Sequence, residues 1–313
     1  MSLKKIRTKH KPSPEAKVIN LLQKCLPKKL LQKHFSLREY SLNIIKNLWW
    51  LSSYSKPLLK QGFEINTIRL ANCNCEWIFK NESDKKLTVF YVHGGAYLGG
   101  SLSSARQNSM RYPLNVNASL FIVDYRISAA GKYPCALDDA LSAYKFMLSG
   151  LPADSEIIII GDSAGGGLAL SLVKKLLELN IKQPKKIILN SPWVDLTCSS
   201  SSYIANAKND SVLCERFLKE CARYYAGESK MLKNKYVSPL FCDFTGFPPI
   251  HIHVGTNEIL LCDSINIADK ASSQGVTVRL KIWNGMFHMF HYQEKIIRES
   301  AMVCKDIYKD IAL

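Results

Sequence analysis

The sequence has no long hydrophobic run, and this absence limits where the protein can work. No stretch approaches the roughly 18 apolar residues that a membrane-spanning helix requires. The basic N-terminus is not followed by the apolar segment of a secretory signal peptide. Charged residues make up 22% and hydrophobic residues 47% of the 313 positions, as in globular proteins. We therefore expect a globular protein of the cytoplasm.

The sequence also lacks cysteines at the regular spacings of a disulfide framework or a metal site. The ten cysteines are scattered without the spacing of a disulfide framework, so we expect reduced thiols. Cys73 and Cys75 form C-x-C rather than C-x-x-C, and no second pair completes a metal cage. His251 and His253 lie two residues apart on an expected strand, where a structural role is favoured over a metal. The sequence therefore predicts neither a metal nor an organic cofactor.

Acidic residues are few relative to basic ones. The chain has 26 Asp and Glu and 42 Lys and Arg, which gives a net charge of +16. Residues 1–33 hold ten Lys and Arg against one acid, Glu15, so +9 of this excess lies there. Aromatic and basic residues do not interleave as they do on a nucleic-acid platform. We expect no nucleic-acid partner, and only a weak contact of the basic N-terminus with an anionic membrane surface stays open. The sequence sets no oligomeric state.

Residues 156–172 read EIIIIGDSAGGGLALSL and predict a buried strand, a sharp turn and a helix. The four isoleucines at 157–160 are typical of a parallel strand covered on both faces. The next five residues match G-x-S-x-G, which places Ser163 on a strained strand-to-helix turn and points the amide of Ala164 toward the same spot. A turn used only for packing is one alternative. A dinucleotide-binding loop is another, but a serine stands where its middle glycine belongs.

A second glycine-rich loop follows another expected strand. Residues 87–92 predict a buried strand, and it ends in the loop HGGAYLGGS at 93–101. The adjacent Gly94 and Gly95 let backbone N–H groups face an open pocket without obstruction by side chains. The alternative is that residues 93–101 form only a flexible loop. The presence of the Ser163 turn in the same chain makes that alternative weak.

An aliphatic serine is a poor nucleophile at neutral pH, so it needs an imidazole to accept its proton and a carboxylate to orient the imidazole. The chain offers Ser163, then acids, then histidines, which is the order that α/β-hydrolases use. His288 is favoured because it lies in the loop after the last expected strand. His251 and His253 lie within a strand, and His291 is expected to start the following helix.

The acid has two candidates. Glu258 comes directly after the strand expected at 249–254, where its side chain can reach the His288 loop. Asp263 is expected to begin or precede the next helix and to cap it. We therefore favour Glu258 as the acid.

Strands alternate with helices along the chain, which predicts a mainly parallel sheet with functional groups at the carboxyl ends of the strands. Residues 1–12 are expected to be flexible, and helices are expected to begin at Ser13-Pro14 and at Ser36. Residues 197–227 are long for a connection, so they predict part of a lid. We divide the chain into an N-terminal basic segment with cap helices at 1–62, a catalytic domain at 63–313, and a cap insertion at 197–235 within it.

Six motifs occur together and in order: His93-Gly94-Gly95-Ala96, Asp124-Tyr125-Arg126, residues 161–166, Ser191-Pro192-Trp193, residues 255–261 and His288-Met289-Phe290. Over residues 65–310 the chain resembles the hormone-sensitive-lipase-like branch of the α/β-hydrolases. The resemblance implies an α/β-hydrolase fold with an eight-stranded, mostly parallel sheet flanked by helices. It also implies a helical cap, built from the N-terminal helices and an insertion after the sixth strand.

The same resemblance implies a serine carboxylesterase with Gly94, Gly95 and Ala164 as oxyanion-hole donors. With Ser163, Glu258 and His288 as the catalytic residues, we expect hydrolysis of short- to medium-chain esters through an acyl-enzyme. The chain departs from the family in two places: residues 127–130 read ISAA where Leu-Ala-Pro-Glu is usual, and the acid is glutamate where many relatives have aspartate. The alternatives are an amidase or formamidase with the same triad, and a non-catalytic small-molecule receptor on the same fold.

Overall fold

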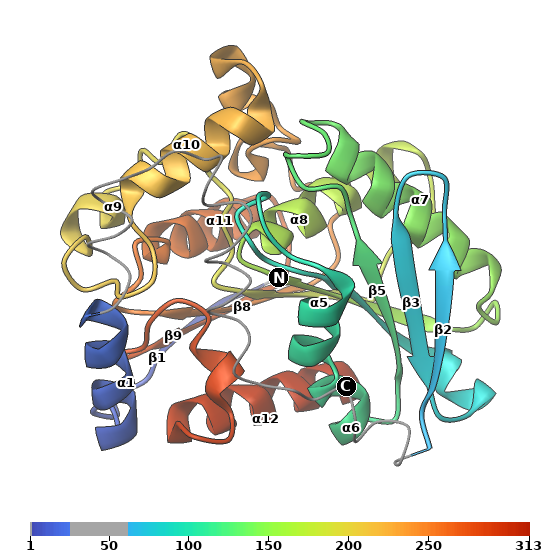
Figure 1. The fold of residues 1–313 in the computed structure, drawn as a ribbon, viewed down its shortest axis with the longest axis horizontal. Coiled ribbons are helices and arrows are strands. Elements are labelled where there is room, and N and C mark those ends of the chain that lie inside the picture. The colour runs from blue at the N-terminus through green and yellow to red at the C-terminus, as the bar shows by residue number, and fades with distance from the viewer. Residues whose placement is uncertain (1, 26–61) are drawn as a thin grey trace.

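The computed structural model describes residues 2–25 and 62–313, and its strands form one nine-stranded sheet in the order β1-β9-β8-β7-β6-β4-β5-β3-β2 (Figure 1). β3 runs antiparallel to β5 and to β2, whereas the remaining neighbours are parallel. The predicted mostly parallel sheet is therefore confirmed. The strands are β1 (Leu3–Arg7), β2 (Glu64–Arg69), β3 (Asn74–Phe79), β4 (Leu87–Val92), β5 (Ser119–Asp124), β6 (Glu156–Asp162), β7 (Lys186–Asn190), β8 (Ile250–Gly255) and β9 (Val278–Trp283).

β1 is a strand that the sequence did not predict. It pairs in parallel with β9, from Leu3 opposite Val278 to Arg7 opposite Ile282. The expected count of eight strands and the expected flexibility of residues 1–12 are therefore wrong. An edge strand needs few apolar contacts and tolerates lysine on its free side. Because three of the five β1 residues are basic, no alternation of apolar residues marked it as a strand.

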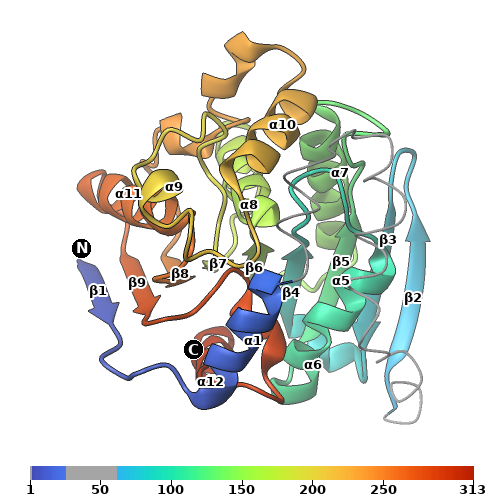
Figure 2. The same ribbon diagram turned by 60° about the vertical axis from the view of Figure 1, so that its left-hand side comes forward.

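Helices cover both faces of the sheet (Figures 1 and 2). One buried cluster joins α7, α8, α10 and α11 to one face, and a second joins α1, α5, α6 and α12 to the other. Alternate residues of the central strands divide between the two clusters; on β4, Phe90 enters the first cluster and Tyr91 the second. The helices are α1 (Pro14–Cys25), α5 (Leu102–Ser109), α6 (Arg111–Asn115), α7 (Cys135–Ser149), α8 (Ala164–Glu178), α9 (Ser202–Ala205), α10 (Glu215–Ala226), α11 (Leu261–Ser273) and α12 (Arg298–Ala312), with the 3-10 turns η2 (Glu82–Lys86), η3 (Ser229–Lys233), η4 (Pro239–Phe241) and η5 (Phe290–Gln293).

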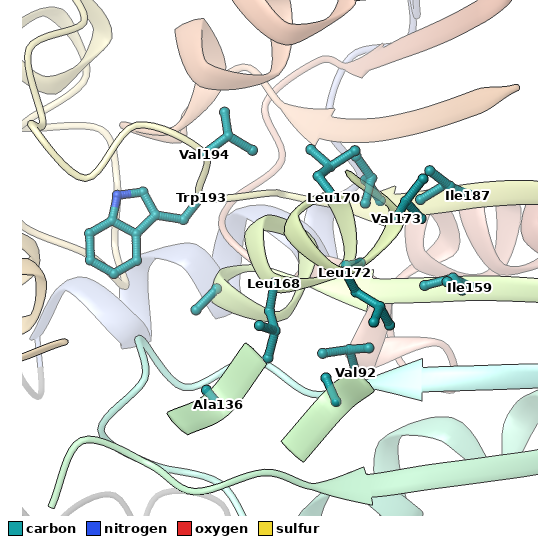
Figure 3. Packing of buried hydrophobic residues seen from close by; sticks show 14 of the residues in the cluster. Val92, Ala136, Ile159, Leu168, Leu170, Leu172, Val173, Ile187, Trp193 and Val194 are labelled. Atoms are coloured by element: carbon teal, nitrogen blue, oxygen red, sulfur yellow. The ribbon is translucent and has the colours of Figure 1, made fainter. Parts of the chain in front are cut away.

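α8, the helix that follows Ser163, has 11 of its 15 residues buried, and Figure 3 shows its apolar side chains among their neighbours. Leu168 and Leu172 of α8 lie near Val92 of β4, and Ile159 and Ile187 extend the contact along β6 and β7. Each fully buried leucine contributes roughly 1.5–3 kcal/mol of transfer free energy. The turn at Ser163 is thus anchored by a buried strand on one side and a buried helix on the other.

The insertion expected at 197–235 contains α9, α10 and η3 and lies between β7 and β8 in the chain. Phe217 and Leu218 of α10 belong to the same buried cluster as α8, so the insertion packs on that helical layer (Figure 1). The helix expected from Ser36 lies outside the described residues. Of the helices expected in residues 1–62, the structure therefore describes only α1.

α1 begins at Pro14 as predicted, and Ser13 Oγ accepts a hydrogen bond from the amide of Ala16 at 3.3 Å. Ala16 is buried against α12 and its neighbours, whereas Val18, Leu21 and Leu22 are 55–63% exposed. Among the helices of residues 2–25 and 62–313, none is both long enough and apolar enough to cross a membrane.

Candidate active site

Ser163 occupies the turn between β6 and α8 in a conformation that few residues other than glycine adopt, with φ 54° and ψ −119°. The turn is held from both sides, because the amide of Ser163 donates to Asn190 O and the amide of Trp193 donates to Ser163 O, each at 2.9 Å. A Cβ atom on Gly165 would lie 2.2 Å from Val92 O, so the sequence needs glycine there. The strained turn predicted from G-x-S-x-G is present.

The structure brings Ser163, His288 and Glu258 together at the carboxyl ends of β6, β8 and β9. His288 Nε2 lies 3.0 Å from Ser163 Oγ, and His288 Nδ1 lies 2.9 Å from Glu258 Oε2. Glu258 is fully buried, and Ser163 and His288 are 7% and 6% exposed. This is the geometry that a proton relay from a serine hydroxyl to an imidazole requires.

The rival acid lies elsewhere. Asp263 accepts hydrogen bonds from the amides of Val194 and Asp195, both at 3.1 Å, and so fixes the chain after β7. Burial raises the pKa of Asp263 to about 8. The carboxylate that contacts His288 is that of Glu258.

The rival histidines also have other partners. His251 Nδ1 lies 3.0 Å from Asp310 Oδ2 of α12, and burial lowers the pKa of His251 to about 3. His253 is buried beside it, and Trp283 Nε1 lies 3.4 Å from its Nδ1. His291 lies in η5, and its Nε2 is 3.4 Å from Asp162 Oδ2. Within the described residues no cluster of three or more His, Cys, Asp or Glu is arranged to hold a metal ion.

Ser191 is a site residue whose role the sequence did not reveal. Ser191 Oγ donates to Glu258 Oε1 at 2.8 Å, and the amide of Gly255 donates to the same oxygen at 2.5 Å. Glu258 therefore has one carboxylate oxygen for His288 and one for these two donors. Ser191 was noted only within the motif Ser191-Pro192-Trp193. Its contact with the acid follows from its place just after β7, which lies next to β8 in the sheet, and no local pattern in the sequence marks that contact.

Asp162, the residue before the serine, is a fully buried carboxylate beneath the turn. Asp162 Oδ2 accepts hydrogen bonds from Tyr91 at 2.5 Å and Tyr292 at 2.8 Å, and Asn190 Nδ2 donates to Oδ1 at 2.8 Å. Burial alone would raise the pKa of Asp162, but His291 and these donors hold it below its usual value. The network ties β4, β6, β7 and η5 together under the nucleophile.

The loop of Gly94 and Gly95 lies directly against the nucleophile. A Cβ atom on Gly94 would lie 3.2 Å from Ser163 Cβ, and Gly95 has a φ of 127° that side chains disfavour. Among the described residues, none accepts a hydrogen bond from the amides of Gly94, Gly95 or Ala164. These three N–H groups are therefore available as donors to a bound molecule.

His93, which starts this loop, is a structural residue. Its ring stacks on Tyr125 with centroids 4.2 Å apart, and its Nδ1 lies 2.8 Å from Gly94 O. Burial lowers the pKa of His93 to about 4, so it is neutral at physiological pH. The unusual residues 127–130 still support the loop, because the amide of Ser128 donates to Tyr97 O at 2.7 Å.

Known proteins resemble this chain in sequence and in fold. A model of the alpha/beta hydrolase fold family matches residues 89–292. An esterase of Acinetobacter venetianus is 34% identical over 244 residues, which cover 78% of this chain and 80% of that protein. An acetyl-hydrolase of Streptomyces hygroscopicus is 30% identical over 235 residues, with coverage of 75% and 78%.

Among solved structures, a hormone-sensitive lipase from a metagenome library is 30% identical and superposes with a TM-score of 0.85. The match covers 97% of this chain and 99% of that one. The match over 89–292 spans most of the sheet, from β4 through β9, and it includes Ser163, Glu258 and His288. The chain therefore belongs to the α/β-hydrolase family, in its hormone-sensitive-lipase-like branch, and is a carboxylic ester hydrolase.

Proposed function

We propose that the chain is a serine carboxylesterase that hydrolyses short- to medium-chain carboxylic esters through an acyl-enzyme on Ser163. The observation that carries the proposal is the continuous pair of contacts from Ser163 Oγ to His288 Nε2 at 3.0 Å and from His288 Nδ1 to Glu258 Oε2 at 2.9 Å. A hydroxyl, an imidazole and a carboxylate in this order form a nucleophile with its base and the group that orients the base.

In the first step Ser163 Oγ attacks the ester carbonyl while its proton passes to His288 Nε2. Glu258 accepts the Nδ1 proton in a hydrogen bond and stabilises the imidazolium that forms. The carbonyl oxygen becomes an anion beside the free amides of Gly94, Gly95 and Ala164, each of which is worth about 10²–10³ in kcat in comparable sites. When the intermediate collapses, the ester C–O bond breaks and His288 protonates the leaving alcohol.

In the second step a water molecule takes the place of the alcohol. His288 removes a proton from the water, the resulting hydroxide attacks the acyl-enzyme carbonyl, and the same amides hold the oxyanion. The bond to Ser163 Oγ then breaks, the proton returns to the serine, and the carboxylic acid leaves. Neither step requires a group from outside the chain other than water.

The preference for short acyl groups is supported by the relatives. The Streptomyces hygroscopicus protein is named an acetyl-hydrolase, and the substrate class we propose extends from such acetyl esters to medium chains. The receptor alternative is disfavoured, because a receptor has no need of the intact contacts among Ser163, His288 and Glu258.

The test is the hydrolysis of p-nitrophenyl esters from acetate to palmitate by the wild type and by Ser163→Ala. We expect the highest kcat/KM on short to medium chains and no turnover by the variant. Ser199→Ala is the matched control, because Ser199 is exposed and its hydroxyl contacts Asp195. Turnover that survives Ser163→Ala would refute the proposal. If the rates rise on emulsified long-chain esters, the substrate is instead a lipid at a surface. If an aryl formamide is cleaved faster than the matching ester, the enzyme is an amidase.

A further inference from the structure

The loop that carries Glu258 is bonded to the cap insertion through three side chains spaced four residues apart. Ser202 lies at the start of α9, Asn206 just after it, and Asp210 in the following turn. Ser202 and Asp210 are buried, and Asn206 is half-buried. We call these three residues the acid-loop clasp, because all of them bond the backbone between residues 256 and 262.

The bonds of the clasp fall on both sides of Glu258. Asn206 Nδ2 donates to Thr256 O at 3.0 Å and to Glu258 O at 2.7 Å. Asp210 Oδ2 accepts from the amide of Ile259 at 2.8 Å. Ser202 Oγ donates to Ile259 O at 2.5 Å and accepts from the amide of Cys262 at 3.0 Å. The peptide groups before and after the acid are therefore fixed by side chains from outside the sheet.

Asp210 also fixes the insertion itself. Its Oδ1 accepts hydrogen bonds from the amides of Val212 at 2.9 Å and Leu213 at 2.8 Å, so one carboxylate joins the segment before α10 to the acid loop. Burial raises the pKa of Asp210, while His288 and the three amides act against that rise.

The side chain of Glu258 is held by His288, Ser191 and the amide of Gly255, but those contacts control only the carboxylate. The position of its Cα depends on the loop, and the loop is bonded to the clasp. A displacement of about 1 Å at a catalytic group can cost about 10² in rate. Loss of a hydrogen bond of the clasp can therefore lower the reaction rate by displacing Glu258.

We propose that Ser202, Asn206 and Asp210 are positioning residues of the cap insertion, which act on catalysis by holding the backbone of Glu258. This inference rests on the proposed function of Glu258 as the triad acid. It gives the insertion a role in the chemistry itself, because the same segment that borders the site also sets the geometry of the proton relay.

The first test is a double-mutant cycle between Asn206→Ala and Glu258→Gln. Asn206 is chosen because it is only half-buried, and Asn234→Ala is the control: Asn234 is also a half-buried asparagine of the insertion, and its Oδ1 accepts the nearby amide of Tyr236 at 2.8 Å. Since two backbone bonds are lost, we expect Asn206→Ala to lower kcat about tenfold with KM changed less than about twofold. In the Glu258→Gln background the same change should have no effect on kcat.

An equal loss of kcat in both backgrounds would overturn the proposal, because the effect would then not pass through Glu258. A loss in Asn234→Ala equal to that in Asn206→Ala would also overturn it, because the effect would then belong to the insertion as a whole. Asp210→Asn extends the cycle. Asparagine keeps the shape of the side chain and one acceptor oxygen, but its NH₂ group then faces backbone N–H donors, either those of Val212 and Leu213 or that of Ile259.

The second test does not require turnover, so it separates the clasp from the proposed function. The Nδ1 proton of His288 in its bond to Glu258 is expected as a low-field ¹H NMR resonance that disappears in Glu258→Gln. We expect Asn206→Ala and Asp210→Asn to shift or broaden it and Asn234→Ala to leave it unchanged. If the resonance is unchanged in Asn206→Ala, the proposal that the clasp positions Glu258 is refuted. If the wild type does not hydrolyse the esters but the resonance shifts or broadens in Asn206→Ala, the proposed esterase function is refuted. The positioning role of the clasp is then still supported.

Discussion

Ser191 Oγ lies 2.8 Å from Glu258 Oε1, so a serine at the end of β7 holds the carboxylate that orients His288. A hydrogen bond to a charged group contributes about 1.5–3 kcal/mol. We therefore expect Ser191→Ala to lower kcat about 10- to 100-fold with little change in KM. Steady-state hydrolysis of p-nitrophenyl acetate measures both, with the exposed Ser199→Ala as the control. A wild-type kcat in Ser191→Ala would show that the amide of Gly255 alone is sufficient.

The two acids that follow β8 are expected to have opposite effects on turnover. Glu258→Gln removes the charge that stabilises the imidazolium, so kcat should fall by about three to four orders of magnitude. Asp263→Asn should leave kcat within about twofold, because Asp263 bonds the amides of Val194 and Asp195 and not the histidine. The two variants are compared in the same ester assay. The reverse pattern would assign the role of the acid to Asp263.

Asp263 should instead control how stability depends on pH. Its pKa is raised to about 8 by burial, against about 3.9 for an unfolded aspartate, so the folded protein retains a proton that the unfolded chain has released. The stability that this proton contributes is complete below about pH 4 and is lost as the pH rises through about 8. Asp263→Asn removes the ionisation. The thermal midpoint of the variant, relative to the wild type, should therefore rise from pH 5 to about pH 8 and change little from there to pH 9.

Asp243→Asn is the control for this pH series. Asp243 is exposed, and hydrogen bonds from the backbone and side chain of Thr245 lower its pKa. Its ionisation therefore affects stability only in more acidic solution, below the range of the series. If the curves of wild type and Asp263→Asn run parallel from pH 5 to pH 9, Asp263 is ionised in the folded protein and the prediction fails.

Alanine at Gly95 should damage the oxyanion loop. A Cβ atom at Gly95 would lie 2.2 Å from Gly99 O, and the φ of 127° is unfavourable for any side chain, so the loop must shift. We expect kcat to fall about 10² or more, as for the loss of an oxyanion-hole donor. Gly62→Ala is the control, because Gly62 has a φ of 77° with no atom within 4 Å of the added Cβ. Equal kcat values in the two variants would argue against a role for this loop.

The features that the sequence predicted were those encoded by residues close together in the chain. The isoleucines of β6 followed by G-x-S-x-G specify a buried strand and a strained turn, and the positions of Glu258 and His288 directly after strands place them at one edge of the sheet. Those patterns express backbone conformation and burial, which short stretches determine.

The features that were missed depend on contacts between distant segments. Asn206 reaches Glu258 O across 52 positions, and Ser191 reaches the Glu258 carboxylate across 67, without any local pattern that marks either pair. On α1 the apolar residues Val18, Leu21 and Leu22 recur at helical spacing and are exposed, whereas Ala16 makes the buried contact. Spacing identifies the apolar side of a helix, but not which neighbour lies beside it.

The pairing of β1 with β9 joins residues near the two extremes of the numbering, since Leu3 is opposite Val278. During synthesis the partner of β1 appears only after the other eight strands of the sheet have been made. The β1–β9 pairing is therefore a contact of very high sequence separation, and such contacts are costly in loop-closure entropy to form. Whenever β1 is unpaired, the charges of its lysines and arginine oppose association with the strands of another chain.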